Sequence, residues 1–220
     1  YGVEGDFHFV LVNSKNVQWD FNLNASYLKN TVVSLADNVK DSKAYDANGK
    51  EYEGFTSGSF FVAEGASMYT WYTYDYAGVD QQTGKALYWK RNEFVDKATG
   101  QPTFELETTD DYSEADYFIF DTSLPDLYGG FTTSFDFYGV DISANFSYQI
   151  GGQPYDSGYA SMMGSPMTTS VGFALHRDLW DAWAPETKTS NIPRFYYSDE
   201  YTSPTSSRFL TDASYLNIQN

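Results

Sequence analysis

The sequence contains no cysteine, which excludes disulfide bonds and thiolate metal sites. It also lacks any apolar run of about 18 residues, so no helix is expected to span a membrane. Basic residues are scarce: 13 Lys and Arg stand against 30 Asp and Glu, and the formal net charge is −17. Because nucleic-acid phosphates need a cationic face, this charge argues against nucleic acid as a partner.

Aromatic residues are abundant, with 20 Tyr, 17 Phe and 5 Trp in 220 residues. Chains that stay disordered are poor in aromatic and β-branched residues, so disorder is not expected. Aromatic side chains also fit the pleated surface of a sheet. The composition therefore predicts an all-β protein.

Strict alternation of apolar and polar residues predicts long strands. From Val140 to Ile150, every second residue is apolar and every residue between is polar. Residues 128–138 show a similar pattern, and Tyr138-Gly139 is a turn pair, so the two runs predict a hairpin. The N-terminal part repeats this design near 2–12 and 17–28, around turn-forming residues 13–16. A further strand is expected at 213–220.

The length of these runs favours a membrane environment. Strands of soluble sheets have about 5–6 residues, whereas a tilted membrane strand needs roughly 9–11. Aromatic residues lie near the ends of the runs (Trp19, Tyr27 and Tyr148), as interfacial girdles require. The polar faces suit a watery lumen, although the outer face of a soluble sandwich is also polar. We therefore expect a membrane barrel, with the sandwich as the alternative.

The order of the strands predicts two long external loops. In outer-membrane barrels the short turns are periplasmic and the long loops are external. With short turns at 13–16 and 138–139, residues 29–126 form one long external excursion or contain an even number of extra crossings. Residues 151–212 form the second external loop. The first segment holds 18 acidic and 8 basic residues and the second 7 and 4, so much of the negative charge would lie outside.

Five strands cannot close a barrel, because small membrane barrels need about 8. An open edge in hydrocarbon leaves backbone groups without hydrogen bonds, at a cost of several kcal/mol each. We therefore expect these residues to be part of a larger barrel.

Four blocks of sequence resemble the C-terminal barrel of SusC/RagA-type TonB-linked outer-membrane proteins. They are LPDLYGGF at 124–131 with VDISA at 140–144 and FSYQIGG at 146–152; AGVD at 77–80 with TGKALY at 83–88; WAPE at 183–186 with NIPR at 191–194; and SRFL at 207–210 with ASYL at 213–216. The blocks span most of the chain in the order of the family, which makes the series more specific than any single block.

The resemblance implies an outer-membrane, multi-pass protein with a 22-stranded barrel. In this family an N-terminal plug fills the barrel, TonB supplies energy, and a SusD-like surface lipoprotein forms a lid. Such pairs import oligosaccharides or peptides. No plug and no TonB-interacting segment is expected within these residues, so the energy-coupling roles transfer to none of them.

No metal site or cofactor is predicted. Glu4, Asp6 and His8 share a strand face, but a polar lumen wall explains them. Asp46-Ala47-Asn48-Gly49 begins like a calcium loop but lacks the later carboxylate, which indicates a turn.

No catalytic residue is predicted either. His176 has no nucleophilic serine in a G-x-S-x-G context. Asp110 and Asp111 could imitate the acid pair of a glycosidase, but acids are abundant throughout this segment.

Aromatic side chains in the two loops are the candidates for substrate contact, because sugar rings and peptides pack on flat apolar faces. The candidates are Trp71, Tyr74, Tyr88, Trp89, Trp180 and Trp183. The alternative is that they pack the loops together. Trp180 and Trp183 lie in a helical-looking stretch, 171–183, and would share a docking face with Phe173 and Leu179.

The sequence thus predicts a transmembrane β-barrel segment of a TonB-dependent importer with long extracellular loops, in contact with outer-membrane lipid. The alternative is a soluble secreted β-sandwich that binds glycans, which would purify without detergent. A third candidate, an acidic glycoside hydrolase, would need hydrolysis that disappears on Asp110→Asn or Asp111→Asn.

Overall fold

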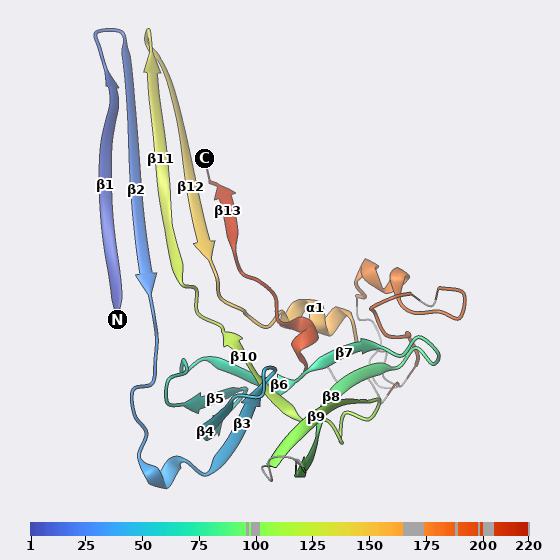
Figure 1. The fold of residues 1–220 in the computed structure, drawn as a ribbon. Coiled ribbons are helices and arrows are strands. Elements are labelled where there is room, and N and C mark those ends of the chain that lie inside the picture. The colour runs from blue at the N-terminus through green and yellow to red at the C-terminus, as the bar shows by residue number, and fades with distance from the viewer. Residues whose placement is uncertain are drawn as a thin grey trace.

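The computed structural model describes residues 1–95, 97, 102–164, 174–187, 189–197, 199 and 205–219. These residues form a long sheet and, at one end of it, a second region of mostly shorter strands and short helices (Figure 1). We call this second region, made by the described residues of 29–126 and 151–212, the distal domain. The short turns lie at the far end of the sheet, away from the distal domain. None of the helices in the described ranges has the length and apolar character needed to cross a membrane.

The long sheet is antiparallel throughout, with the strand order β1-β2-β11-β12-β13. Its strands are β1 (Gly2–Asn13), β2 (Val17–Leu28), β11 (Leu127–Phe137), β12 (Val140–Ile150) and β13 (Tyr215–Ile218). The first two strands have 12 residues each and the next two have 11. The last strand begins later than the sequence predicted, and residue 220 lies outside the described residues.

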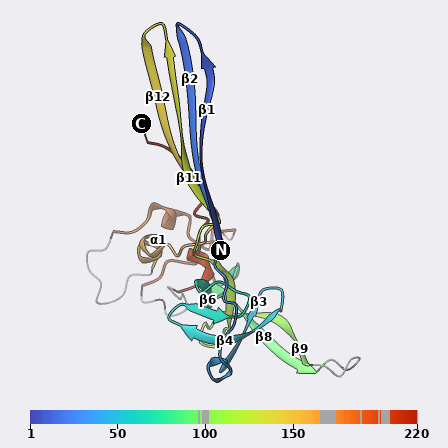
Figure 2. The same cartoon turned by 90° about the vertical axis from the view of Figure 1, so that its left-hand side faces the viewer.

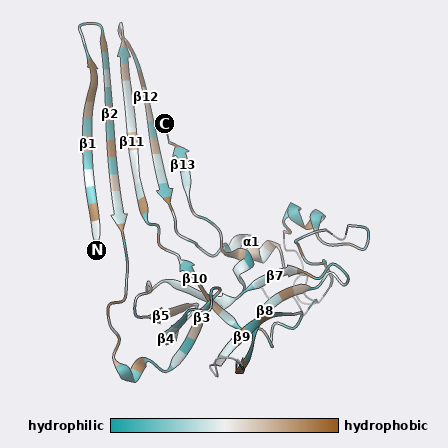
Figure 3. Cartoon of the chain, in the orientation of Figure 1, coloured by the Kyte–Doolittle hydropathy of each residue, from teal (hydrophilic) through white to brown (hydrophobic). Residues whose placement is uncertain are grey.

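The register brings the apolar residues of all five strands onto one face. Phe131 lies opposite Leu23 on one side and Phe146 on the other, and Phe146 lies opposite Ile218. Successive side chains of a strand point to opposite faces, so the residues between them form a second, polar face. Figure 3 shows the alternation along each long strand.

Aromatic contacts connect the strands across the apolar face. The ring centroids of Phe9 and Phe21 are 6.3 Å apart, those of Phe21 and Phe131 5.7 Å, and those of Phe131 and Phe146 4.5 Å. Aromatic pairs at such distances contribute about 0.5–1.5 kcal/mol each beyond area burial. Trp19 lies on the same face, opposite Phe135.

Among the described residues, no second layer covers this apolar face. None of the buried core residues in those ranges comes from the five strands of the long sheet. Ile142 is 63% exposed and Ile218 is 72% exposed. Figure 2, which views the molecule from the side, shows the sheet as a single narrow layer above the distal domain.

Two short turns set the register. In the β11–β12 hairpin, Tyr138 has φ of 52° and Gly139 has φ of 82°. Two consecutive positive φ angles are typical of the type I′ turn, whose twist matches that of the flanking strands. In the β1–β2 hairpin, the Ser14 amide donates to the Val17 carbonyl at 2.9 Å.

The segment 29–126 is folded, where the sequence predicted a long loop. Five of its strands close a small barrel in the order β10-β3-β4-β5-β6: β3 (Ser42–Asp46), β4 (Glu51–Ser57), β5 (Phe60–Ala63), β6 (Thr70–Tyr74) and β10 (Tyr117–Thr122). A second, three-stranded sheet contains β7 (Tyr76–Val79), β8 (Ala86–Val95) and β9 (Pro102–Thr109). A 3₁₀-helix, η1 (Asp37–Val39), precedes β3.

A small core explains why this segment folds. Ala44, Phe61, Ala63 and Ile119 are buried together inside the small barrel, with Tyr72 packed against them. The strands are short, and the segments that separate them contain residues such as Gly, Asn and Ser. Separating segments of this kind are typical of loops, so the sequence did not reveal the strands within the excursion.

The excursion leaves and re-enters the long sheet through neighbouring strands. The Leu28 amide donates to the Asp126 carbonyl at 3.1 Å, and Tyr27 lies opposite Leu127. Of the two options left open by the sequence, the structure therefore has a single excursion and no extra crossing in the sheet.

The segment 151–212 docks on the distal domain. Its regular elements in the described residues are α1 (Ser157–Met162) and the 3₁₀-helices η2 (Arg177–Asp181) and η3 (Ser207–Phe209). Ala160, Met163 and Phe209 form its core. Part of the helix predicted at 171–183 lies outside the described residues, because 171–173 are not described.

Candidate functional site

The structure distributes the six aromatic candidates over separate environments in the distal part of the molecule. Four of them, Trp71, Tyr74, Tyr88 and Trp89, come from strands β6 and β8. The other two, Trp180 and Trp183, come from η2 and the segment after it. The surroundings of each side chain decide whether it can meet a ligand.

Tyr74 and Tyr88 belong to a tyrosine cluster at the junction of the two distal sheets. Tyr88 is 0% exposed, and its ring centroid lies 6.1 Å from that of Tyr74, 6.0 Å from Tyr76 and 6.3 Å from Tyr112. Burial raises the pKa of Tyr74 to about 12, so its hydroxyl stays neutral. These two tyrosines pack between the two distal sheets.

Trp71 and Trp89 are half-buried and make structural contacts. The indole N–H of Trp71 donates to the Gln153 carbonyl, and its ring packs on Phe60 with centroids 4.6 Å apart. Trp71 therefore ties the small barrel to the segment that follows β12. The backbone N–H of Trp89 donates to the Asp75 carbonyl at 2.9 Å.

Trp180 and Trp183 do not share a docking face, so that prediction is wrong. The 3₁₀-helix ends at Asp181, and Ala182 is extended with φ of −60° and ψ of 151°, which turns Trp183 away. Trp183 packs against Gly84, where any Cβ would overlap its ring, and its Nε1 donates to the Gln81 carbonyl at 3.3 Å. Trp180 is 91% exposed.

An open groove adjoins Trp180. Its volume is about 440 Å³, and it is lined by Trp180, Asp181, Thr187, Thr189, Ser190, Asn191 and Ile192. The groove thus combines one free indole face with hydroxyl, amide and carboxylate groups. Among the six aromatic candidates, Trp180 alone is largely exposed beside a polar groove.

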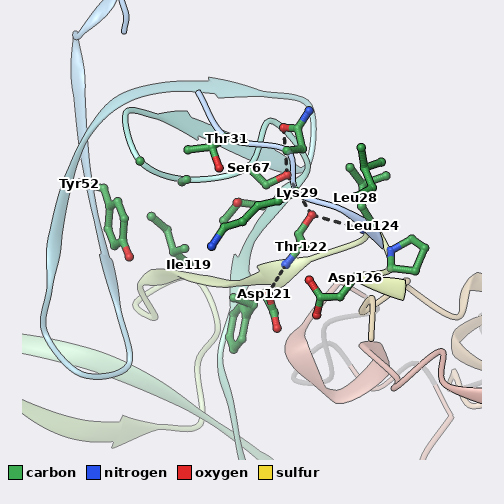
Figure 4. Close-up of a pocket in the computed structure, with 16 residues that line it drawn as sticks. Leu28, Lys29, Thr31, Tyr52, Ser67, Ile119, Asp121, Thr122, Leu124 and Asp126 are labelled. Carbon is green, nitrogen blue, oxygen red and sulfur yellow. Dashed lines mark hydrogen bonds between the residues drawn. The ribbon is translucent and has the colours of Figure 1, made fainter. Parts of the chain in front are cut away.

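A second cavity, of about 300 Å³, lies where the long sheet meets the small barrel. Figure 4 shows Lys29, Asp121 and Asp126 around it, together with Thr122, whose hydroxyl donates to Ser67 Oγ at 3.0 Å. Its walls come from the strands that enter and leave the distal domain, so the cavity marks the junction between the two parts.

The sequence did not single out a buried polar contact that holds the C-terminal segment. Ser207 Oγ donates to Asp75 Oδ1 at 2.8 Å and accepts from the Tyr76 amide at 2.9 Å. Burial raises the pKa of the Asp75 carboxyl, and burial also lowers the pKa of the guanidinium of Arg208, which follows Ser207 in the chain. In the sequence, Asp75 lies between Tyr74 and Tyr76 and belongs to no recognisable motif. Arg208 belongs to the SRFL block, which gives no sign that it is buried.

Two of the residues considered for metal binding, His8 and Asp46, bond to other groups. His8 Nδ1 lies 2.6 Å from Asn22 Oδ1, and no metal-binding cluster occurs within the described ranges. Asp46 accepts bonds from the amides of Asn48 and Lys50 across a turn.

The residues considered for catalysis are also engaged elsewhere. Asp110 pairs with Lys85 at 2.5 Å, whereas Asp111 accepts from Ser113, which lowers the Asp111 pKa. His176 Nδ1 accepts from the Asp178 amide at the start of η2.

The long sheet is antiparallel, and its long strands and apolar face without a cover among the described residues are features that membrane-barrel walls share. No protein-family model matches the chain. A curated relative, the TonB-dependent receptor P26 of Formosa agariphila, is 23% identical over 223 residues, covering 93% of this chain and 21% of that protein.

Solved structures of the RagAB peptide transporter share the fold. In one of them the match covers 99% of this chain and 22% of the transporter chain, with a TM-score of 0.70 and 20% identity. The closed-closed state of the RagAB peptide importer gives a TM-score of 0.64 at 21% identity. The open-open state gives 0.65 at 18% identity.

The resemblance to SusC/RagA-type TonB-linked outer-membrane proteins is therefore confirmed. These relatives carry the names of receptors and transporters and not of enzymes. The chain spans 21% of the length of the curated relative that it matches.

Replacing Trp183 should loosen the distal domain, whereas replacing Trp180 should not. Trp183→Ala leaves a gap beside Gly84, and we expect it to cost about 1–3 kcal/mol locally. Trp180→Ala, at an exposed site, should stay within about 0.5 kcal/mol. Hydrogen exchange of the β7 and β8 amides in the intact parent protein measures both. Equal effects of the two variants would contradict the packing described for Trp183.

Replacing Asp75 should change the pH dependence of local stability. Its pKa is raised in the folded state, so the folded state favours the protonated carboxyl, and stability falls as pH rises from the unfolded pKa through the folded one. Asp75→Asn removes the buried charge and keeps an oxygen to accept from Ser207. The variant should be more resistant to exchange at pH 7, with a smaller difference near pH 4. A difference that grew at low pH would contradict this account.

Proposed function

We propose that this chain forms part of the barrel wall, with an attached external domain, of a TonB-dependent outer-membrane importer. The observation that carries the proposal is the continuous apolar face of the long sheet, which no described residue covers. Exposed in water, a face of this extent would be an aggregation site. In the outer membrane, lipid would cover it.

The length of the strands supports a membrane span. A strand of 12 residues extends about 40 Å at roughly 3.3 Å per residue. Tilted by about 45°, it rises close to 28 Å, near the ~25 Å apolar band of outer-membrane barrels. Most soluble strands are about half as long in residues.

The polar face supports an aqueous lumen. Thr132 lies opposite Asn22 and Asn145, and its hydroxyl donates to Asn145 Oδ1 at 2.7 Å. Asp136 and Asp141 lie opposite each other on this face. Two carboxylates at neighbouring positions favour water over hydrocarbon.

In the proposed orientation the short turns are periplasmic and the distal domain is external. The parent protein would have a 22-stranded barrel, and these strands would act as fixed wall. The plug and the segment that engages TonB would come from parts of the parent protein outside this chain. A SusD-like surface lipoprotein would cover the external side. The net negative charge of 29–126 and 151–212 then lies in water.

The substrate class we propose is an oligosaccharide or a peptide. The peptide transport named for the RagAB structures supports the second, while a free indole ring suits either. Trp180 and its groove are the proposed contact, because the other five aromatic candidates are buried or half-buried. No covalent step is proposed.

The competing soluble sandwich would need a second sheet over the apolar face. A sandwich core is made by two inner faces that interdigitate about 10 Å apart. The only other sheets in the described residues belong to the distal domain, end to end with the long one (Figure 1).

Cysteine labelling tests the membrane proposal. The chain has no native cysteine, so Phe146→Cys and Asn145→Cys can each be labelled without background. Both side chains are half-buried in the sheet, so protein packing alone predicts similar labelling. In outer-membrane vesicles, a water-soluble thiol reagent should label Asn145→Cys and spare Phe146→Cys. Equal labelling of both would contradict a lipid-covered face.

Uptake by living cells tests transport and the role of Trp180. Uptake of labelled short peptides or oligosaccharides by cells that carry the parent protein should stop when the proton-motive force is collapsed. Trp180→Ala should weaken the apparent affinity about two- to tenfold, the loss of one aromatic contact. Arg177→Ala, a neighbouring exposed change, serves as the control. Uptake that persists without the proton-motive force would contradict TonB coupling.

A further inference from the structure

Strand β9 forms one edge of the three-stranded distal sheet. It pairs with β8 from Val95↔Pro102 to Tyr88↔Thr109, and the strand order is β7-β8-β9. Its other edge has no strand partner among the described residues. The β8–β9 hairpin projects from the body of the distal domain (Figure 2). An open edge of this kind presents a row of unpaired backbone N–H and C=O groups.

The central side chains of β9, from Phe104 to Glu107, alternate between apolar and acidic. Glu105 and Glu107 share one face, opposite Asn92 and Lys90 on β8. Leu106 points to the other face and is 41% exposed. The middle of the edge therefore offers two negative charges, at Glu105 and Glu107, with the apolar side chain of Leu106 between them.

The two glutamates of β9 have no ion pair or side-chain hydrogen bond in the described part of the chain. The ammonium of Lys90, the nearest base across the ladder, lies 3.4 Å from Glu114. By comparison, Glu51 pairs with Lys43 and Glu64 pairs with Lys40. Glu105 and Glu107 therefore place two carboxylates without a basic partner side by side on one face of β9, as far as the described residues show.

A second copy of this chain would be a poor partner for the edge. In the antiparallel register centred on Leu106, Glu105 of each copy would lie opposite Glu107 of the other. Like charges directly opposite each other destabilise a ladder. Charge complementarity instead favours a strand with basic side chains at alternate positions.

We propose that β9 is a docking edge for an extended polypeptide segment of a protein partner, with Lys or Arg at every second residue. The partner strand would add to the sheet through main-chain hydrogen bonds. Its basic side chains would face Glu105 and Glu107, and its apolar ones would contact Leu106. This interaction goes beyond the proposed transport and does not depend on it.

Peptide binding to the intact parent protein in detergent micelles tests the docking edge. The probe is a fluorescent eight-residue peptide of alternating Lys and Val, the length of β9. Fluorescence anisotropy should show saturable binding that weakens as salt increases. Hydrogen exchange should show new protection of β9 amides in the complex. A peptide with Glu in place of Lys, and one N-methylated along its pairing edge, should not bind.

Matched variants assign the binding to β9. Glu105→Lys with Glu107→Lys should weaken peptide binding about tenfold or more, through loss of two ion pairs and new repulsion. Glu53→Lys with Glu186→Lys changes the net charge equally at exposed positions elsewhere and should leave binding unchanged. Exchange of the β8 amides reports that the hairpin stays folded.

Several results would overturn the proposal. These are equal binding by the two double variants, binding of the N-methylated peptide, and β9 amides that are already protected before peptide is added. Self-association of the parent protein through β9 would overturn it as well. Uptake in cells is a separate readout, so a failure of docking and a failure of transport can be told apart.

Discussion

The need to cover one apolar face governs this structure. Five strands place Phe, Leu, Ile, Val and Trp side chains on the same side of a single-layer sheet, and the register keeps them there across every ladder. A shift of one residue in any strand would move its apolar set to the polar side. The tight turn at Tyr138-Gly139 and the aromatic contacts from Phe9 to Phe146 therefore both stabilise the register that keeps the apolar side chains on one face.

The distal domain covers its apolar side chains in a different way, by burying them in a core of its own. The strands of its small barrel are short, and their apolar side chains face inward around Ala44, Phe61, Ala63 and Ile119. Aromatic residues here join sheets to each other instead of facing outward, as the cluster around Tyr88 shows. One chain thus contains a sheet suited to an apolar medium and a domain that makes its own core.

The sequence predicted the parts of the fold that rest on local pattern. Alternation from Val140 to Ile150 identified a strand that the structure places at the same residues, and Tyr138-Gly139 identified its turn. The small barrel was missed because its strands have only four to seven residues and show no long alternation, and because Gly-, Asn- and Ser-containing segments separate them. Their stability comes from contacts between distant segments, such as Phe61 with Ile119, which no local window contains.

The aromatic candidates show the same limit at the level of single residues. Tyr88 and Trp180 look equally suited to bind a ligand in the sequence, yet one is fully buried and the other almost fully exposed. The expected shared face of Trp180 and Trp183 failed because the chain leaves the helix at Ala182. Asp75 and Arg208 were not singled out because their burial arises only when segments over 100 residues apart meet, as Ser207 does with Asp75, 132 positions away.

The adjacency of Leu28 and Asp126 bears on how the molecule assembles. Pairing β2 with β11 closes a loop of nearly a hundred residues, and such closure slows folding because its entropy is lost before any contact forms. If the small barrel forms first, it already holds the two ends of the excursion side by side. The pairing of β2 with β11 can then form one residue pair at a time, from Tyr27↔Leu127 to Val17↔Phe137, toward the turns. The distal domain would in this way act as the nucleus on which the wall is built.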